Sequence, residues 1–309
     1  MSSSITSQIK QQLTLQGFDL VGISKAGFLE KEAKDLEQWL HEGRHGTMSW
    51  MENHFDKRVD PRLLVEGAKS VISVLLNYFP DPSHHQPADA PKISTYAWGE
   101  DYHKVIKNKL HRVLEWIQAN VGEVNARIFT DSAPVMDKAW ATRGGLGWIG
   151  KNTNLIHPKM GSWYFIGEII LDLELEYDGP MKDYCGTCTK CIDACPTEAL
   201  TPYQIDSRKC ISYLTIELRE NIPPTLRAQT ENWAYGCDIC QQVCPWNSFA
   251  TPNGGDFKPL SHILELGKAE WAALDEKQFK KLTKHSAMSR VKWDKMEQNL
   301  QNSQNQDLG

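Results

Sequence analysis

Eight cysteines could do chemistry in this chain of 309 residues, and all of them lie between residues 185 and 244. The first four are spaced C-x2-C-x2-C-x3-C and end in Cys195-Pro196. Cys210 comes next, followed by a C-x2-C-x3-C-P run from Cys237 to Pro245. Bacterial chains that hold two [4Fe–4S] centres use this run, and its fourth cysteine serves the other cluster. The spacing predicts two clusters, one held by Cys185, Cys188, Cys191 and Cys244 and the other by Cys195, Cys210, Cys237 and Cys240.

Two other roles for the cysteines fit less well. Disulfides require an oxidising compartment. The sequence begins with a polar segment and has no arginine before Arg44, so it shows neither a secretory nor a twin-arginine signal. Structural zinc sites usually combine two C-x2-C pairs, not three cysteines at a spacing of three followed by Cys-Pro. We therefore expect the chain to carry electrons.

The overall composition points to no nucleic-acid or membrane partner. The formal net charge is −5 at pH 7, so no general basic field is present. Apolar stretches such as 71–76 are far too short to span a bilayer. We expect a soluble, cytoplasmic protein. The chain has eleven tryptophans, whose flat rings could stack on a large planar ligand or on bases, although filling the core explains most of them equally simply.

A glycine-rich segment invites a nucleotide-binding interpretation that its position does not support. Residues 145–150 match G-x-G-x-x-G, and residues 145–151 nearly match a P-loop, with Asn152 where serine or threonine should hold magnesium. Both motifs need a strand before the loop and a helix after it. Here the expected order is helix, loop and extended segment. The loop could instead present Lys151 and Asn152 to a ligand, or it could be a plain tight turn.

The elements that position these residues can be read from the apolar pattern. We expect helices over 5–16, 28–40, 101–119, 134–143 and 258–295, and strands over 18–23, 70–78, 126–130 and 163–173. The fold class is predicted to be α+β. The predicted parts are an αβ catalytic domain over 1–175, a ferredoxin-like domain over 176–250, a helical segment over 251–296 and a disordered tail over 297–309.

Further motifs follow one another along the chain in a fixed order. They read Lys57-Arg-Val-Asp-Pro61, Tyr96-Ala-Trp-Gly-Glu-Asp-Tyr-His103, Thr130-Asp-Ser-Ala-Pro-Val-Met-Asp137, Arg143-Gly-Gly-Leu-Gly-Trp-Ile-Gly-Lys-Asn152, Arg208-Lys-Cys-Ile-Ser-Tyr-Leu-Thr-Ile-Glu217 and Tyr235-Gly-Cys-Asp-Ile-Cys-Gln-Gln-Val-Cys-Pro-Trp-Asn247. With these motifs and the cysteines, the chain resembles the epoxyqueuosine reductases over roughly residues 5–290. These are cobalamin-dependent iron–sulfur enzymes of tRNA modification.

The resemblance implies an activity, a fold and cofactors. The family reduces the epoxide of epoxyqueuosine at the wobble position of tRNAs to an alkene, the last step of queuosine synthesis. It implies a cobalamin over the αβ domain, close to one cluster, and a catalytic domain like those of nitroreductases and reductive dehalogenases. The implied partners are a tRNA anticodon stem-loop carrying epoxyqueuosine and an external one-electron reductant. Many members add a C-terminal helical-repeat domain, for which this chain is too short.

Asp131 is the proton donor that the family's Thr-Asp motif implies. It follows the strand expected over 126–130 and precedes the helix expected from Pro134. Loss of an epoxide oxygen as water needs electrons and protons, and a positioned acid can supply a proton. The residues alone leave open a second role, because aspartate before a helix commonly caps it. As a donor, Asp131 would need a pKa raised by a pocket of low dielectric.

The sequence also bears on how the cobalamin is held. Asp101-Tyr-His103 begins the D-x-H-x-x-G motif that ligates cobalt through histidine, but Ile106 replaces the glycine. We therefore expect a base-off cobalamin without a histidine ligand. Family position gives the cofactor contacts as Arg58, Ser94, Asp131, Lys151, Asn152, Leu155, Ser212 and Asp238. Taken alone, Arg58 could form a surface salt bridge and Ser212 could cap a helix.

A local basic segment could bind tRNA despite the acidic total charge. It contains Lys277, Lys280, Lys281, Lys284, His285, Arg290, Lys292 and Lys295. A solvated helix face is the simpler alternative. Single-stranded loops are usually bound by stacking on aromatic rings, for which Trp98, Trp246 and Trp293 are candidates.

Two rival functions remain for comparison. A reductive dehalogenase would usually carry an export signal and a tyrosine acid, whereas this sequence shows no such signal and has aspartate at the matching motif. A non-catalytic iron–sulfur subunit would bind no cobalamin. We expect a monomeric enzyme.

Overall fold

A four-stranded antiparallel sheet forms the centre of the αβ body in this computed structural model, which describes residues 4–304 and the side chains of 4–303. The strand order is β1 (Leu20–Lys25), β2 (Ser70–Asn77), β7 (Tyr164–Leu171) and β4 (Ala126–Phe129). Every residue of β2 is buried, as its β-branched and apolar sequence predicts for a strand covered on both faces.

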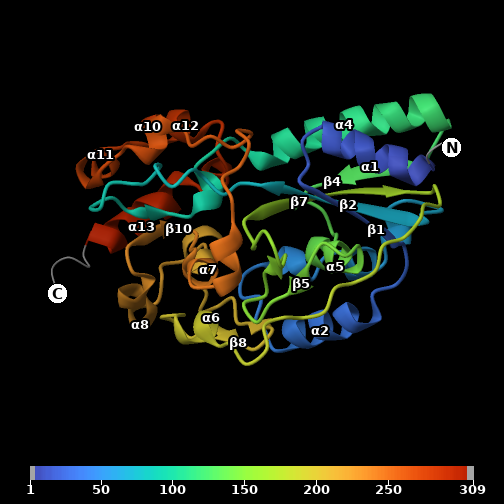
Figure 1. The fold of residues 1–309 in the computed structure, drawn as a ribbon. Helices are drawn as coiled ribbons and strands as arrows, with labels where there is room; N and C mark the ends of the chain where they lie inside the picture. The colour runs from blue at the N-terminus through green and yellow to red at the C-terminus, as the bar shows by residue number, and fades with distance from the viewer. Residues whose placement is uncertain (1–3, 305–309) are drawn as a thin grey trace.

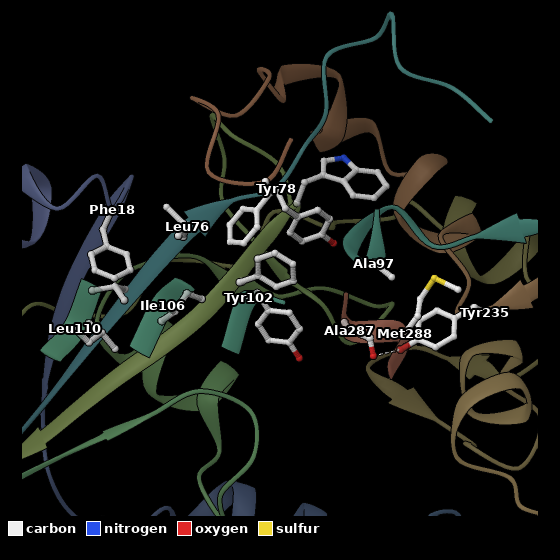
Figure 2. Close-up of a cluster of buried hydrophobic side chains, with 14 of the residues drawn as sticks. Phe18, Leu76, Tyr78, Ala97, Tyr102, Ile106, Leu110, Tyr235, Ala287 and Met288 are labelled. Carbon is white, nitrogen blue, oxygen red and sulfur yellow. Dashed lines mark hydrogen bonds between the residues drawn. The ribbon is translucent and has the colours of Figure 1, made fainter. Parts of the chain in front are cut away.

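Helices cover both faces of this sheet (Figure 1). On one face lie α1 (Ile5–Leu15) and α4 (Tyr102–Val121), and on the other lie α2 (Glu30–His41) and α5 (Asp137–Arg143). Alternate residues of a strand point to opposite faces. Leu76 therefore packs with Ile106 and Leu110 of α4 (Figure 2), whereas Val71 packs with Trp140 of α5. The two faces thus have separate hydrophobic clusters.

The glycine-rich segment forms a hairpin, and the nucleotide interpretation is excluded by the chain order. Helix α5 precedes it, and the short strands β5 (Trp148–Ile149) and β6 (Leu155–Ile156) pair antiparallel within and after it. Gly147 has φ +151°, and a Cβ there would lie 2.3 Å from the carbonyl oxygen of Ile156. The glycines therefore bring protein backbone together. The helix begins at Asp137, three residues later than expected, so Pro134 lies before it.

The cysteine-rich segment consists of short elements. They are α6 (Lys190–Asp193), β8 (Leu200–Thr201), β9 (Gln204–Ile205), α7 (Ile211–Ile216), α8 (Pro224–Arg227), β10 (Trp233–Tyr235) and α9 (Ile239–Gln242). Strand β10 pairs with β3 (Lys92–Ile93). Tyr235 of β10 lies in the same hydrophobic cluster as Tyr102 of α4. The segment is thus joined to the αβ body through backbone pairing and shared packing.

Four helices end the described chain, namely α10 (Ser261–Leu264), α11 (Lys268–Ala272), α12 (Glu276–Thr283) and α13 (Trp293–Gln304). The predicted disordered tail is wrong for 297–304, since α13 includes these residues. Leu300 is buried, and Asn299 Nδ2 donates hydrogen bonds to the carbonyl oxygens of Thr215 and Ala234. Tertiary contacts thus order a polar segment that the composition predicted to be disordered. Residues 305–309 lie outside the described residues.

The remaining described elements are short. They are α3 (Phe55–Val59) and the 3-10 helices η1 (Ser49–Met51), η2 (Pro61–Leu63), η3 (Thr95–Ala97), η4 (Ala228–Thr230), η5 (Pro245–Phe249) and η6 (Ala287–Arg290). Within residues 4–304, no helix has the length and apolar character needed to cross a membrane.

Candidate active site

A cavity of about 860 Å³ lies where the αβ body, the cysteine segment and the C-terminal helices meet. Its wall includes Tyr102 at the start of α4, Asp131 after β4, Cys210 before α7 and Arg290 in η6. The volume is near the upper end of ordinary cofactor pockets. The cavity is therefore large enough for a bulky cofactor, and residues from three parts of the chain line it.

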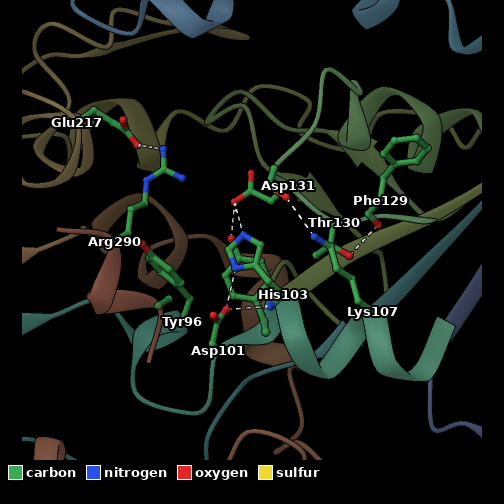
Figure 3. Close-up of polar contacts among 12 residues, drawn as sticks. Tyr96, Asp101, His103, Lys107, Phe129, Thr130, Asp131, Glu217 and Arg290 are labelled. Carbon is green, nitrogen blue, oxygen red and sulfur yellow. Dashed lines mark hydrogen bonds and ion pairs between the residues drawn. The ribbon is translucent and has the colours of Figure 1, made fainter. Parts of the chain in front are cut away.

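Asp131 is held at this cavity by two side chains of α4. The Tyr102 hydroxyl donates a hydrogen bond of 2.5 Å to Oδ2 of Asp131, and His103 Nε2 lies 3.4 Å from the same oxygen. His103 Nδ1 lies 2.8 Å from Oδ1 of Asp101, the N-cap residue of α4. Figure 3 shows Asp101, His103 and Asp131 in a row. Both ring nitrogens of His103 therefore face carboxylate oxygens, as suits a protonated imidazole.

The helix-cap alternative for Asp131 is excluded by its position. Helix α5 begins six residues later, and its N-cap residue is Met136. Asp131 has φ +56°, in the left-handed region that is sparsely populated by residues other than glycine. Its side chain is 52% exposed, but this exposure is to the cavity, since Asp131 is one of the lining residues. A backbone outlier at a cavity wall is typical of a functional position.

The expected rise in the pKa of Asp131 is wrong for the side chains that surround it in the structure. Burial raises the pKa of this carboxyl, but the hydrogen bonds from His103 and Tyr102 and the charges of His103 and Arg290 outweigh it and lower the pKa below its ordinary value. Burial lowers the pKa of His103, but its contacts with Asp131 and Asp101 raise it above the ordinary value overall. The pair thus holds its proton on the histidine.

Arg58 does not form the surface salt bridge that its sequence allowed. The residue is only 6% exposed, lines the cavity and donates to the carbonyl oxygen of Trp50 at 3.2 Å. Its buried Nε has no hydrogen-bond partner. A buried guanidinium nitrogen without a partner is costly, so the site is suited to a polar ligand group. Trp50, which is 43% exposed, also lines this cavity and was not anticipated from the sequence.

Five of the eight predicted cofactor contacts line the cavity: Arg58, Ser94, Asp131, Asn152 and Ser212. Asn152 is buried and donates through Nδ2 to the carbonyl oxygen of Cys240 at 3.1 Å. Ser212 lies inside α7, whose N-cap residue is Cys210, so it is not a cap. The structure thus brings most of the predicted set to one place.

The other three predicted contacts do not line this cavity. Lys151 Nζ donates to the carbonyl oxygens of Gly186 and Cys188, at 2.7 and 3.0 Å. Leu155 is buried in a hydrophobic cluster beside β2. Asp238 is buried and accepts hydrogen bonds from Ser94 Oγ and from the Thr95 amide. Asp238 therefore positions Ser94, and Lys151 fixes the loop of the first cysteines.

The cysteines fall into two groups in space. Burial raises the pKa of Cys191, and the neighbouring thiolates of Cys244, Cys185 and Cys188 raise it further. Burial likewise raises the pKa of Cys237, and its neighbours there are Cys210 and Cys240. Cys195 is a neighbour of Cys210, and Cys240 has Cys210, Cys191 and Cys195 as neighbours. Apart from the proximity of Cys191 to Cys240, these neighbour relations follow the crossed grouping that the spacing predicts.

The two groups of cysteines face different cavities. Cys195, Cys210, Cys237 and Cys240 line the cavity that contains Asp131. Cys185, Cys188, Cys191 and Cys244 line a second cavity of about 450 Å³. Only the group of Cys195, Cys210, Cys237 and Cys240 is thus positioned next to the candidate catalytic acid.

A pair of acids lies under the Asp131 loop on the α5 side of the sheet. Glu168 of β7 is fully buried, and Phe129, two residues before Asp131, is its partner in β4. Burial raises the pKa of Glu168 well above its ordinary value, and the nearby charge of Asp137 adds to the rise. Burial also raises the pKa of Asp137 above its ordinary value. Both shifts favour the protonated, uncharged forms of this buried pair.

The predicted basic segment divides into surface and cavity residues. Lys277, Lys281, Lys284 and Lys292 are exposed, whereas Lys295 is buried and donates to the carbonyl oxygen of Glu220. The prediction that Lys295 belongs to a basic segment available to tRNA is therefore wrong. Arg290 lines the active-site cavity, where its Nη2 pairs with Glu217 at 2.7 Å. The segment thus links an exposed basic surface to the cavity.

The predicted stacking tryptophans lie elsewhere. Trp98 and Trp293 are partly buried against the main hydrophobic cluster. Trp246 lies beside Trp148 at the second cavity. Trp50 is the one large exposed ring among the described residues that lines the active-site cavity.

The fold and the site together define an iron–sulfur oxidoreductase with a large cofactor cavity. The family described as "Epoxyqueuosine reductase QueG, DUF1730" matches residues 58–132, and the one described as "4Fe-4S double cluster binding domain" matches residues 184–247. An epoxyqueuosine reductase of Leadbetterella byssophila is 56% identical over 95% of this chain and 96% of its own length. One of Cellulophaga algicola is 53% identical over 94% and 95%. The chain belongs to the epoxyqueuosine reductase family.

Solved structures of the family have the same fold. The enzyme of Streptococcus thermophilus superposes with a TM-score of 0.91 at 29% identity, over 99% of this chain and 82% of that one. An epoxyqueuosine reductase bound to an epoxyqueuosine-modified tRNA-Tyr stem loop gives 0.87 at 28%, over 97% and 80%. One from Bacillus subtilis, at 0.86 and 28% over 97% and 81%, has its catalytic aspartate loop swung out of the active site. The α+β class and the two [4Fe–4S] clusters are confirmed, and the family implies cobalamin as the further cofactor.

Proposed function

We propose that this chain reduces the epoxide of epoxyqueuosine in tRNA to the alkene of queuosine, with Asp131 as the acid that protonates the departing oxygen. The observation that carries this proposal is the position of Asp131, whose carboxyl faces the same cavity as Cys195, Cys210, Cys237 and Cys240. An electron-transfer subunit would need neither that cavity nor an acid in it.

The residues at the cavity fit a cobalamin. When bound, the two clusters and the cobalamin supply the two electrons that the reduction requires. Arg58, with its unpartnered Nε, and Ser94, Asn152 and Ser212 would hold the cofactor from the cavity wall. Both ring nitrogens of His103 face carboxylates, so this histidine is occupied, in agreement with a cobalamin that has no histidine ligand.

The side chains of Asp101, His103 and Asp131 form the row that holds and transfers the proton. The contacts described above favour a protonated His103 beside an ionised Asp131, since they raise the pKa of His103 and lower that of Asp131. Filling the cavity removes water from this ion pair, and desolvation favours the uncharged forms of both groups. Asp131, on the cavity wall, would then carry the proton. The acid is thus prepared when substrate and cofactor bind.

The tRNA is proposed to approach over the basic segment that ends at Arg290. Lys277, Lys281, Lys284 and Lys292 would contact phosphates, and Trp50 would stack on an unpaired base in the cavity. The relative solved with a modified stem loop supports this class of substrate. We further propose that the chain acts in the cytoplasm as a monomer and takes electrons from an external one-electron reductant.

The test is an anaerobic reaction with tRNA that carries epoxyqueuosine. The protein is supplied with cobalamin and reduced methyl viologen, and nucleosides from the digested tRNA are analysed by mass spectrometry. We expect epoxyqueuosine to be replaced by queuosine, which has one oxygen atom fewer. A protein that holds its clusters but binds no corrinoid and leaves the epoxide intact would instead be an electron-transfer subunit. Turnover of aryl halides in place of tRNA would indicate a dehalogenase.

A further inference from the structure

The second cavity is lined by a different group of cysteines from the cavity that contains the catalytic acid. This group is called the first group of cysteines. Cys185, Cys188, Cys191 and Cys244 all line it, and it shares only Asn152 with the wall of the active-site cavity. A bound tRNA and cobalamin would occupy the active-site cavity. The first group of cysteines is therefore the one that a second macromolecule can approach during catalysis.

An aromatic cluster surrounds this second cavity. Tyr184 and Phe249 are 50% and 54% exposed, and the ring of Trp246 lies between them with centroids 6.0 and 6.1 Å away. The buried Trp148 contacts both Trp246 and Tyr184, and its Nε1 lies 3.5 Å from Cys185 Sγ. Contiguous exposed aromatic rings are typical of protein interaction sites. Here they extend from the surface to a cluster ligand.

The charges around this surface favour an acidic partner. Lys182 and Lys190 are exposed, and neither has an ion pair among the described residues. Lys151 and Lys190 line the second cavity, whereas no aspartate or glutamate of the described residues does, and Asp183 and Asp193 lie outside that lining. Asp183 accepts hydrogen bonds from the Cys185 amide and the Tyr203 hydroxyl, and Asp193 accepts one from Thr189. The charged side chains that line the second cavity, apart from its cysteines, are thus positive, which aids encounter with a negatively charged protein.

We propose that Tyr184, Lys190, Trp246 and Phe249 form the docking surface for an acidic one-electron carrier protein that reduces this enzyme. The inference rests on the proposed function, which requires an external reductant. Each encounter delivers one electron and leaves the carrier oxidised by one electron, so two encounters and two protons convert one epoxide to an alkene and water. Redox encounters use small, weak interfaces, and a few exposed rings beside a lysine suit one.

The test compares a protein carrier with a small reductant that needs no docking surface. The variants are Tyr184→Ala, Phe249→Ala and Lys190→Glu, each first shown to hold wild-type iron and sulfide. Phe28→Ala is the matched control, because Phe28 is 47% exposed and lines neither cavity. With reduced flavodoxin, an acidic flavoprotein, we expect KM for the carrier to rise about fivefold or more. With reduced methyl viologen we expect turnover within about twofold of wild type.

A binding measurement gives a readout that is independent of turnover. Calorimetry with oxidised flavodoxin should show weaker binding to the three variants than to wild type and Phe28→Ala, and the wild-type affinity should fall as salt rises. Equal affinities and KM values in all proteins would overturn the proposal, as would a wild-type chain that methyl viologen reduces but flavodoxin neither binds nor reduces. Loss of tRNA binding or of self-association in the variants would assign the surface to those partners instead. Failure of wild type with methyl viologen would count against the proposed function itself.

Discussion

The Tyr102 hydroxyl and the Asp131 carboxylate are joined by a 2.5 Å hydrogen bond across 29 positions of sequence. Tyr102 is fixed by its ring, which stacks on Phe165 of β7 at 4.1 Å. Asp131 follows β4, the neighbour of β7 in the sheet. The protonation of the candidate acid is therefore set by the packing of α4 against the sheet.

Asp131→Asn should retain both clusters, cobalamin and tRNA binding but lose more than about tenfold in turnover. The amide has nearly the shape of the acid but cannot deliver a proton, and general acid catalysis contributes on the order of 10²–10⁴-fold. The measurement is queuosine formation followed by mass spectrometry. Normal turnover would transfer the role of acid to water or to another residue.

Tyr102→Phe should shift the pH dependence of turnover. The change keeps the ring stacked on Phe165 but removes a hydrogen bond that lowers the pKa of Asp131, so that pKa rises. A general acid works only while protonated, so activity declines as pH rises through its pKa. The descending limb should therefore move to higher pH in the variant. An unchanged limb with a lower plateau would indicate a purely structural role for the hydroxyl.

Cys195→Ala should damage one cluster more than the other. The wild-type chain should contain about eight irons and eight sulfides, the content of two [4Fe–4S] clusters. The variant should lose the cluster assigned to Cys195, Cys210, Cys237 and Cys240 and retain most of the other. Iron and sulfide analysis with electron paramagnetic resonance of the reduced protein checks this. Zinc in place of iron, or a single cluster in wild type, would contradict the assignment.

Bound cobalamin should show no protein nitrogen on cobalt. Two histidines line the active-site cavity, His54 and His103, and the ring nitrogens of His103 are both occupied by carboxylates. Electron paramagnetic resonance of the cobalt(II) form should therefore lack axial nitrogen splitting. A nitrogen splitting that disappears in His54→Ala or His103→Ala would show a histidine ligand after all.

Glu168→Gln should flatten the dependence of stability on pH. Burial raises the pKa of Glu168 and of Asp137, to about 6 for Asp137, so between pH 4 and these raised values the folded state binds more protons than the unfolded state. Stability then falls as pH rises, with a slope of at most about 1.4 kcal/mol per pH unit for one proton. Urea unfolding at pH 5 and pH 8 should show a smaller loss in Glu168→Gln than in wild type. Glu174→Gln, at an exposed position just after β7, should behave like wild type.

Much of the local structure and chemistry follows from the sequence. The buried strand at 70–77, the helix capped by Asp101 and the cysteine spacing are local signals, since periodicity, capping and ligand spacing act over a few residues. The helix–loop–extended order around Gly147 likewise argued against a nucleotide loop from the sequence, and the structure has that order. The prediction of a disordered tail failed for residues 297–304 because contacts with distant residues such as Thr215 order this segment.

Only the tertiary structure decided which of these residues meet. Family position placed Lys151, Leu155 and Asp238 among the cofactor contacts, yet their side chains are turned to a cluster loop, a hydrophobic cluster and Ser94. The pKa of Asp131 could not be read from its motif either, because His103 and Arg290 reach it from α4 and η6. A motif specifies residue types along the chain. The charge state and direction of each side chain depend on neighbours that folding brings from elsewhere in the sequence.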